Sequence, residues 1–125
     1  MEFAKKSLGQ NFLIDKNVIR KIINSKKITQ KNIIEIGPGT GALTTEIVKK
    51  NPKSLLLIEK DNKLSKKLKK RFINNNKIDI VNQDILKFDF KKIKKKSIIF
   101  GNLPYNISSQ ILVKIIKLKN LSSKC

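Results

Sequence analysis

Four short strand-like segments, three of them apolar runs, are separated by segments with helical spacing and constrain the fold of this chain more than any other feature. The strand-like segments occupy residues 32–36, 54–59, 78–82 and 97–101. Runs in which consecutive positions are apolar are typical of strands buried on both faces, as parallel strands are. Strands that alternate with helices along the chain predict a parallel sheet with helices on its two faces.

Helical spacing of apolar residues predicts the elements around these strands. The predicted helices span residues 15–24, 43–50, 62–72 and 108–118, and Asp15 is placed to cap the first of them. Right-handed crossovers then arrange the first three strands in the order 3-2-1, with the fourth strand on the other side of the first. We therefore expect a Rossmann-like α/β sheet of order 3-2-1-4. Its ligand site is expected at the carboxyl ends of the strands, where the strand order reverses.

Length and composition set the outer bounds of the interpretation. The 125 residues predict one domain, and 39% of them are apolar, which is enough for a core. No apolar run approaches the roughly 20 residues that span a bilayer. The chain has no histidine, and Cys125 is its one cysteine, which excludes a zinc site built from histidine and cysteine ligands. The default expectation is a cytoplasmic protein with no membrane segment and no structural metal.

The chain is also strongly basic. Its 29 lysines and arginines against 9 acidic residues give a formal net charge of +20, which favours a polyanionic partner, either nucleic acid or an acidic membrane face. Arginine occurs only at Arg20 and Arg71, however, and lysine, isoleucine and asparagine, which share A/T-rich codons, dominate the composition. Base bias in the genome explains the excess equally well. Residues 63–71 are expected to form a solvated helix face, and residues 91–96 a basic loop.

Three glycines follow the first predicted strand. Gly37, Gly39 and Gly41 permit a tight turn and bring a ligand close to bare backbone just before a helix begins. Read as G-x-G-x-x-A, the loop fits a dinucleotide. Read as G-x-G-x-G, it fits S-adenosylmethionine (SAM). Glu59, at the end of the second strand, can accept both ribose hydroxyls of either ligand. These residues alone leave both ligand classes open.

A polar residue also follows the third predicted strand. Asp84 can accept a hydrogen bond from an exocyclic amine, such as that of adenine, or it can cap a turn. Ile85, directly after it, can pack on the face of a purine. Acidic or glycine-rich features therefore stand at three successive strand ends, which favours a ligand with a ribose and a base.

The stretch after the fourth strand is the most informative in the chain. Pro104 favours an extended conformation at Leu103, which leaves the Leu103 carbonyl free to accept a hydrogen bond. Asn102 adds an amide oxygen beside it, and Tyr105 adds a flat ring. Two acceptors and a stacking ring suit a planar base that carries an exocyclic NH2 group.

With these residues the sequence resembles a known family. Asn102-Leu103-Pro104-Tyr105 is similar to the amino-methyltransferase motif in its RNA-adenine form. Together with residues 7–13 and 35–44, it resembles the ribosomal RNA adenine N6,N6-dimethyltransferases over about residues 5–118. The Gly-Gln-Asn-Phe-Leu element within residues 7–13 separates this family from other SAM-dependent methyltransferases.

The resemblance implies SAM as the cofactor and assigns residues to it. Asn11 and the backbone of Leu13 would lie over the methionine part, and Gly37 would approach the cofactor backbone. Glu59 would bind the ribose, and Asp84 the adenine amine. The implied cofactor-binding residues are Gln10, Asn11, Leu13, Gly37, Gly39, Gly41, Glu59, Lys60, Asp84, Ile85 and Asn102.

The resemblance also implies the reaction and its substrate. The implied catalytic residues are Asn102, Leu103, Pro104 and Tyr105. Asn102 and the Leu103 carbonyl would hold the N6 amine of the target adenine, and Tyr105 would stack on that base. The amine would then attack the sulfonium methyl group of SAM. The implied substrate is a pair of adjacent adenosines in the hairpin near the 3′ end of small-subunit rRNA, within the immature 30S subunit, and the implied enzyme is a monomer.

Family members continue with three more strands and a helical C-terminal domain, whereas this sequence stops after the helix that follows the fourth strand. We therefore expect residues 1–125 to form the N-terminal part of a SAM-dependent methyltransferase domain, a single incomplete domain whose fourth strand is an exposed edge. Three alternatives remain. They are a large-subunit rRNA methyltransferase of the macrolide-resistance type, a non-catalytic RNA-binding ribosome-assembly factor, and a dinucleotide-dependent oxidoreductase.

Overall fold

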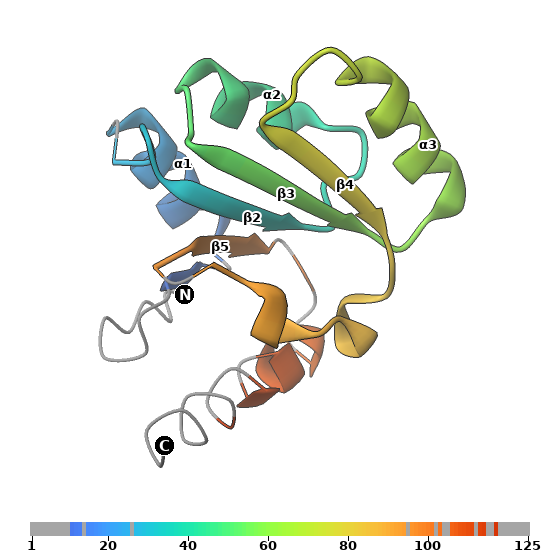
Figure 1. Ribbon diagram of the computed structural model, residues 1–125. Coiled ribbons are helices and arrows are strands. Elements are labelled where there is room, and N and C mark those ends of the chain that lie inside the picture. The colour runs from blue at the N-terminus through green and yellow to red at the C-terminus, as the bar shows by residue number, and fades with distance from the viewer. Residues whose placement is uncertain are drawn as a thin grey trace.

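Five parallel strands form a single sheet at the centre of the molecule (Figure 1). The computed structural model describes residues 11–13, 15–25, 27–94, 96–101, 103, 106–111, 113–114 and 117, and of residues 11–13 it describes the backbone alone. The strand order is β1-β5-β2-β3-β4. The strands are β1 (Asn11–Leu13), β2 (Asn32–Ile36), β3 (Ser54–Glu59), β4 (Ile78–Asn82) and β5 (Ile98–Gly101).

Three helices and two 3-10 turns are complete within the described residues. They are α1 (Lys16–Asn24), α2 (Ala42–Lys49), α3 (Asn62–Arg71), η2 (Ile85–Lys87) and η3 (Phe90–Lys92). Further helical backbone lies at residues 106–111, 113–114 and 117. The Asp15 carboxylate accepts hydrogen bonds from the first turn of α1, and Asp61 does the same for α3, so the polar residue before each helix sets where it begins.

The predicted sheet order is confirmed, with one correction. The strands predicted as first to fourth are β2, β3, β4 and β5, and their order β4-β3-β2-β5 is the expected 3-2-1-4. The expectation that the fourth strand is an edge is wrong, because β1 pairs with β5 from Asn11↔Ile98 to Leu13↔Phe100. A three-residue strand is too short to show a period, and its pairing is made through the backbone, so periodicity could not predict it.

A second correction concerns the basic segment at residues 91–96. It was expected to be a loop, but Lys91 and Lys92 belong to the 3-10 turn η3. The Asp89 carboxylate accepts a hydrogen bond from the Lys91 N–H at 3.0 Å and starts this turn. Phe90 anchors it, because its buried ring packs edge-on against Phe88 with centroids 5.5 Å apart.

Each face of the sheet carries its own apolar core. Helices α1, α2 and α3 cover one face, while the segment from η2 to the last helical residues covers the other (Figure 1). Phe100 belongs to the first core and Ile99 to the second, and both side chains are fully buried. Adjacent residues of β5 therefore point to opposite cores, which explains why the strand reads as a continuous apolar run.

Candidate active site

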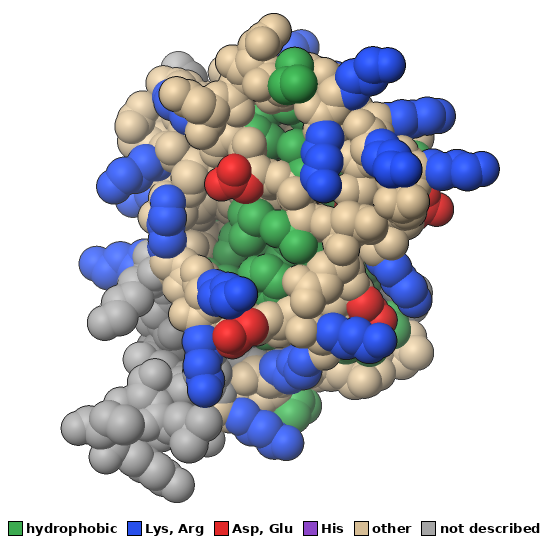
Figure 2. Space-filling view, turned by 45° about the vertical axis from the view of Figure 1, so that its right-hand side comes forward, with side chains coloured by type: hydrophobic (Ala, Val, Ile, Leu, Met, Phe, Trp, Pro, Cys, Tyr) green, Lys and Arg blue, Asp and Glu red, His purple; other side chains and the backbone are tan. Residues whose placement is uncertain are grey.

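The carboxyl ends of the strands meet at one edge of the sheet. Ile36 of β2 lies opposite Ile58 of β3 on one side and Gly101 of β5 on the other. Glu59 lies opposite Asn82 of β4. The strand arrows of Figure 1 point to the side that Figure 2 brings forward, where a hollow with an apolar floor has acidic side chains beside it. Features that the sequence places at separate strand ends are thus brought together.

The glycine loop has a backbone that only glycine adopts without strain. Gly37, Gly39 and Gly41 have φ angles of +68°, +60° and +87°, in the left-handed region. A Cβ atom on Gly39 would meet nothing within 4 Å, whereas one on Gly37 would lie 3.3 Å from Cδ2 of Leu103. The loop therefore packs against the stretch after β5 at Gly37 and presents open space at Gly39.

Glu59 is held at the end of β3 by two backbone donors. Its Oε1 accepts the N–H of Gly39 at 2.9 Å, and its Oε2 accepts the N–H of Asp61 at 2.9 Å. The residue is 7% exposed. A carboxylate has about four lone-pair sites, so two remain for a ligand after these bonds. The predicted ribose-binding residue thus joins the glycine loop to the start of α3, with acceptor capacity to spare.

Glu35, inside β2, is a second buried carboxyl group near the loop, and the sequence analysis assigns it no role of its own. It is 3% exposed, and its Oε1 accepts the hydroxyl of Thr44 at 2.5 Å. Burial raises the pKa of Glu35 to about 7; the bond from Thr44 opposes this rise and the negative charge of Glu59 adds to it. Because Thr44 is in α2, Glu35 ties the strand before the loop to the helix after it.

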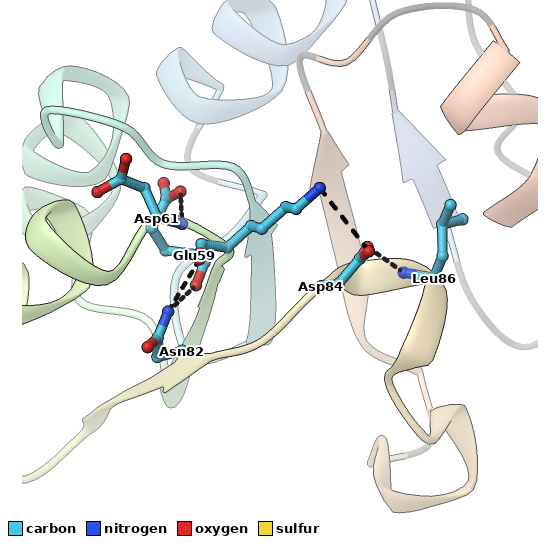
Figure 3. Close-up of polar contacts among 6 residues, drawn as sticks. Glu59, Asp61, Asn82, Asp84 and Leu86 are labelled. Carbon is cyan, nitrogen blue, oxygen red and sulfur yellow. Dashed lines mark hydrogen bonds and ion pairs between the residues drawn. The ribbon is translucent and has the colours of Figure 1, made fainter.

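Asp84 lies after β4 and has two partners. One carboxylate oxygen accepts the N–H of Leu86 at 3.0 Å and caps η2, the alternative role that its position allowed. The other lies 3.9 Å from Nζ of Lys60 (Figure 3). Lys60 is largely exposed, so this oxygen stays open to a further donor. Ile85, which follows Asp84 directly, is buried in the second core.

Asn82 is a positioning residue that the sequence did not reveal. Its side-chain amide donates to the carbonyl oxygens of Glu59 and Lys60, both at 3.0 Å (Figure 3). These bonds fix the turn that carries the Glu59 carboxylate. An asparagine at the end of a strand gives no signal by itself, because its partners lie 22 and 23 positions away in the sequence.

Several predicted site residues lie outside the described residues. They are Gln10, Asn102, Pro104 and Tyr105. Asn11 and Leu13 are described through their backbone in β1 alone. Leu103 is described, and its side chain lies against Gly37. The stretch predicted to hold the target base therefore starts beside the glycine loop.

Two further findings concern metals and membranes. Over the described ranges, no three histidine, cysteine or carboxylate side chains gather as a metal site would require. Within the same part of the chain, no helix is both long and apolar enough to cross a membrane.

Fold and site together define the class of protein. A parallel sheet of this order, with a glycine loop after its first long strand and a carboxylate at the end of the next, is a Rossmann-like fold that binds a ribose-bearing ligand at the carboxyl ends of its strands. The sequence model described as "Ribosomal RNA adenine dimethylase" matches residues 1–124, and the chain belongs to this family. The family resemblance read from the residues is thereby confirmed.

Curated relatives of this chain share one name. The "Ribosomal RNA small subunit methyltransferase A" of Pelagibacter ubique is 54% identical over 114 residues, which cover 90% of this chain and 43% of that protein. The protein of the same name from Malacoplasma penetrans is 45% identical over 123 residues, or 96% of this chain and 44% of that protein. The chain therefore spans less than half the length of the curated relatives it matches.

Solved structures agree on the fold. A dimethyladenosine transferase from Plasmodium falciparum superposes with a TM-score of 0.65 at 30% identity, over 85% of this chain and 38% of that one. The 23S rRNA methyltransferase ErmE superposes with a TM-score of 0.61, also at 30% identity, over 82% of this chain and 41% of that one. Both neighbours share 30% of their residues with this chain in the aligned region.

Proposed function

We propose that this chain supplies the SAM-binding part of an enzyme that dimethylates adenosine at N6 in small-subunit rRNA. One observation carries the assignment of a ribose-bearing cofactor, and membership of the rRNA adenine dimethylase family selects SAM over a dinucleotide. Glu59 is fixed by the N–H groups of Gly39 and Asp61 at the open point of the glycine loop. A carboxylate held in this way accepts a pair of vicinal hydroxyls, and the ribose of SAM presents such a pair.

The other strand ends fit the rest of SAM. Asp84 keeps one carboxylate oxygen available for the adenine amine, beside the buried Ile85. Helix α2 begins at Gly41 with no side-chain cap, unlike α1 and α3, so its first N–H groups favour a carboxylate such as that of the methionine part. Gln10, Asn11 and Leu13 complete this set as the family resemblance assigns it.

The chemistry is a methyl transfer. Asn102 and the carbonyl of Leu103 hold the N6 amine of the adenine, and Tyr105 stacks on the base; base–aromatic stacking contributes about 1–3 kcal/mol toward holding a base outside its helix. The nitrogen lone pair attacks the methyl carbon, the carbon–sulfur bond breaks, S-adenosylhomocysteine leaves, and the amine releases a proton. Orientation is the main contribution, with effective molarities that reach about 10⁵ M or more.

The substrate assignment rests on the relatives. Those of Pelagibacter ubique and Malacoplasma penetrans are both named for the small ribosomal subunit. We propose that the target is a pair of adjacent adenosines in the 3′-terminal hairpin of that rRNA, met in the immature 30S subunit. The proposal includes a cytoplasmic monomer that needs no metal ion, and the net charge of +20 suits an RNA partner.

Calorimetric titration tests the cofactor assignment. SAM is titrated into the 125-residue chain, with NAD as the competing ligand class. The proposal expects saturable SAM binding that Glu59→Ala weakens strongly and Glu46→Ala leaves unchanged, since Glu46 is an exposed residue of α2 paired with Arg20. Binding of NAD in preference to SAM would instead identify a dinucleotide enzyme.

Methylation mapping tests the substrate. Undermethylated small and large ribosomal subunits are incubated with the chain and radiolabelled SAM, and the label is located on each rRNA. We expect label at N6 of adjacent adenosines in the small subunit, abolished by Asn102→Ala. Label in the large subunit would identify the macrolide-resistance type of enzyme. Salt-dependent rRNA binding without SAM consumption would identify a non-catalytic assembly factor.

A further inference from the structure

Arg71 does not behave like the lysines around it. The sequence groups it with the basic cluster at residues 63–71, and the five lysines of that cluster are exposed to solvent as expected. Arg71, the last residue of α3, is exposed as well, but its guanidinium turns back to the glycine loop. Its Nη1 donates to the carbonyl oxygen of Thr40 at 3.2 Å, and its Nη2 donates to the hydroxyl of Thr45.

The loop leaves room for this guanidinium. Gly41 has a φ of +87°, and a Cβ atom on it would lie 2.8 Å from Nη1 of Arg71 and 3.2 Å from Cδ2 of Leu68. Because Gly41 has no side chain, Arg71 and Leu68 of α3 can pack directly on the loop. The ring of Phe72 supports the guanidinium from the other side, with 5.0 Å between Cζ and the ring centroid.

The contacts at position 71 use a guanidinium in ways that a lysine could not. Lysine outnumbers arginine 27 to 2 in this chain, yet arginine stands at position 71. A lysine ammonium is a single point charge on a flexible stem, whereas a guanidinium donates from two nitrogens in one plane and stacks on an aromatic ring. Arg71 uses both properties, since it bonds Thr40 and Thr45 and stacks on Phe72.

We propose that Arg71 is a positioning residue that holds the glycine loop in the shape that receives SAM. The loop is gripped from two sides: Glu59 accepts the N–H of Gly39, and Arg71 binds the carbonyl of the next residue, Thr40. Fixing both ends of this short stretch aims its backbone before the cofactor arrives, which lowers the ordering cost of binding. The inference rests on the proposed SAM site.

The test compares the two arginines of the chain. SAM is titrated into wild type, Arg71→Lys and Arg20→Lys, well below the unfolding temperature of each. Arg20 makes one exposed ion pair with Glu46 at 3.7 Å, so lysine can replace it. We expect Arg71→Lys to weaken SAM binding about tenfold, from the loss of two hydrogen bonds and the stacking. Arg20→Lys should change it less than twofold.

Two further measurements separate positioning from general stability. Thr45→Val removes the α2 hydroxyl that accepts from Nη2 of Arg71, and with it the bond that this hydroxyl donates to the Gly41 carbonyl oxygen at 2.9 Å. A smaller loss of SAM affinity than for Arg71→Lys is expected. In the methylation assay, Arg71→Lys should raise KM for SAM while kcat stays within about twofold.

The outcomes distinguish this inference from the proposed function. Equal SAM affinity in wild type and Arg71→Lys, or an equal loss in Arg20→Lys, overturns the role of Arg71 and leaves the SAM site standing. A wild-type chain that binds no SAM removes the proposed function and this inference with it. A lower unfolding midpoint for Arg71→Lys with unchanged affinity shows a structural contact only, which also overturns the proposal.

Discussion

Two glutamates on neighbouring strands are similarly buried but have different hydrogen-bond donors. Glu35 of β2 is 3% exposed and Glu59 of β3 is 7% exposed. Glu35 accepts one bond, from the hydroxyl of Thr44 inside the fold. Glu59 accepts two backbone N–H groups at the mouth of the site. Both residues are buried glutamates, so they differ only in the number and kind of hydrogen-bond donors that their carboxyl groups receive.

The hydrogen-bond donors around a buried carboxyl group indicate whether it supports the fold or binds a ligand. A buried carboxylate with few donors is costly in its charged form, and the pKa of Glu35 rises to about 7 because of burial. A carboxylate that receives backbone N–H groups is stabilised in its charged form and can present its remaining lone pairs to a ligand. Glu35 is therefore expected to support the fold, and Glu59 to bind the cofactor.

The largest expected effect is on the pH dependence of stability at Glu35. Its pKa is about 7 in the folded chain against 4.5 as the ordinary value. The folded state then binds more protons between these values, so stability falls as pH rises through this window. We expect wild type to lose about 3 kcal/mol between pH 4 and pH 8 relative to Glu35→Gln, at about 1.36 kcal/mol per pKa unit. Urea unfolding of both proteins at the two pH values measures it.

Glu46 supplies the control for that experiment. It is an exposed residue of α2, paired with Arg20 at 3.7 Å. Glu46→Gln should follow the wild-type pH dependence closely, because an exposed ion pair contributes at most about 1 kcal/mol. Parallel curves for wild type and Glu35→Gln would show that the pKa of Glu35 is not raised. The structural role assigned to Glu35 would then lose its support.

The next largest effect is on SAM affinity, and here substitution of Glu59 is expected to matter more than substitution of Glu35. Glu59→Gln replaces one carboxylate oxygen with an NH2 group that faces a backbone N–H donor, and it removes the charge. We expect SAM affinity to fall about 30-fold, as hydrogen bonds to charged groups contribute about 1.5–3 kcal/mol. Glu35→Gln should change it less than about threefold, since its carboxyl faces Thr44. Calorimetric titration of SAM into both variants at pH 8 measures these affinities. Equal losses of SAM affinity would contradict the assignment of Glu59 to binding and Glu35 to the fold.

Much of this arrangement could be predicted from local sequence patterns. The bounds of β2, β3 and β4 are those predicted, because each apolar-rich segment is followed by a polar or glycine residue. The Asp15 cap of α1 is confirmed as well. The convergence of the strand ends followed from the parallel order alone.

The sequence could not show contacts between residues that lie far apart along the chain. Arg71 bonds Thr40 across 31 positions, and nothing in a lysine-rich helix marks it. Glu35 reads as one more residue of a strand until the fold brings Thr44 to it. Strand β1 is defined by its pairing with β5, which lies far along the chain. Such contacts depend on three-dimensional packing, which periodicity does not encode.

The third prediction concerns the loop that joins the two glutamates. Gly39→Ala meets no atom within 4 Å, so only the strain of a left-handed residue applies, about 1 kcal/mol. Gly41→Ala adds a contact of 2.8 Å with Arg71, and we expect about 2 kcal/mol of destabilisation in total. Urea unfolding measures both. A Gly39→Ala variant that unfolds more easily than Gly41→Ala would mean that Arg71 moves aside without cost.

The smallest effect is expected at Lys60, which the family resemblance places among the cofactor-binding residues. Its Nζ lies 3.9 Å from the Asp84 carboxylate, and its side chain is 79% exposed. An exposed ion pair of this kind contributes roughly 0–1 kcal/mol, so Lys60→Gln should change SAM affinity less than twofold and leave unfolding nearly unchanged. Its backbone carbonyl, which accepts from Asn82, is kept in the variant. A loss as large as that of Glu59→Gln would show that the Lys60 side chain itself contacts the cofactor, and binding at this edge would then depend on a charged pair rather than on Glu59 alone.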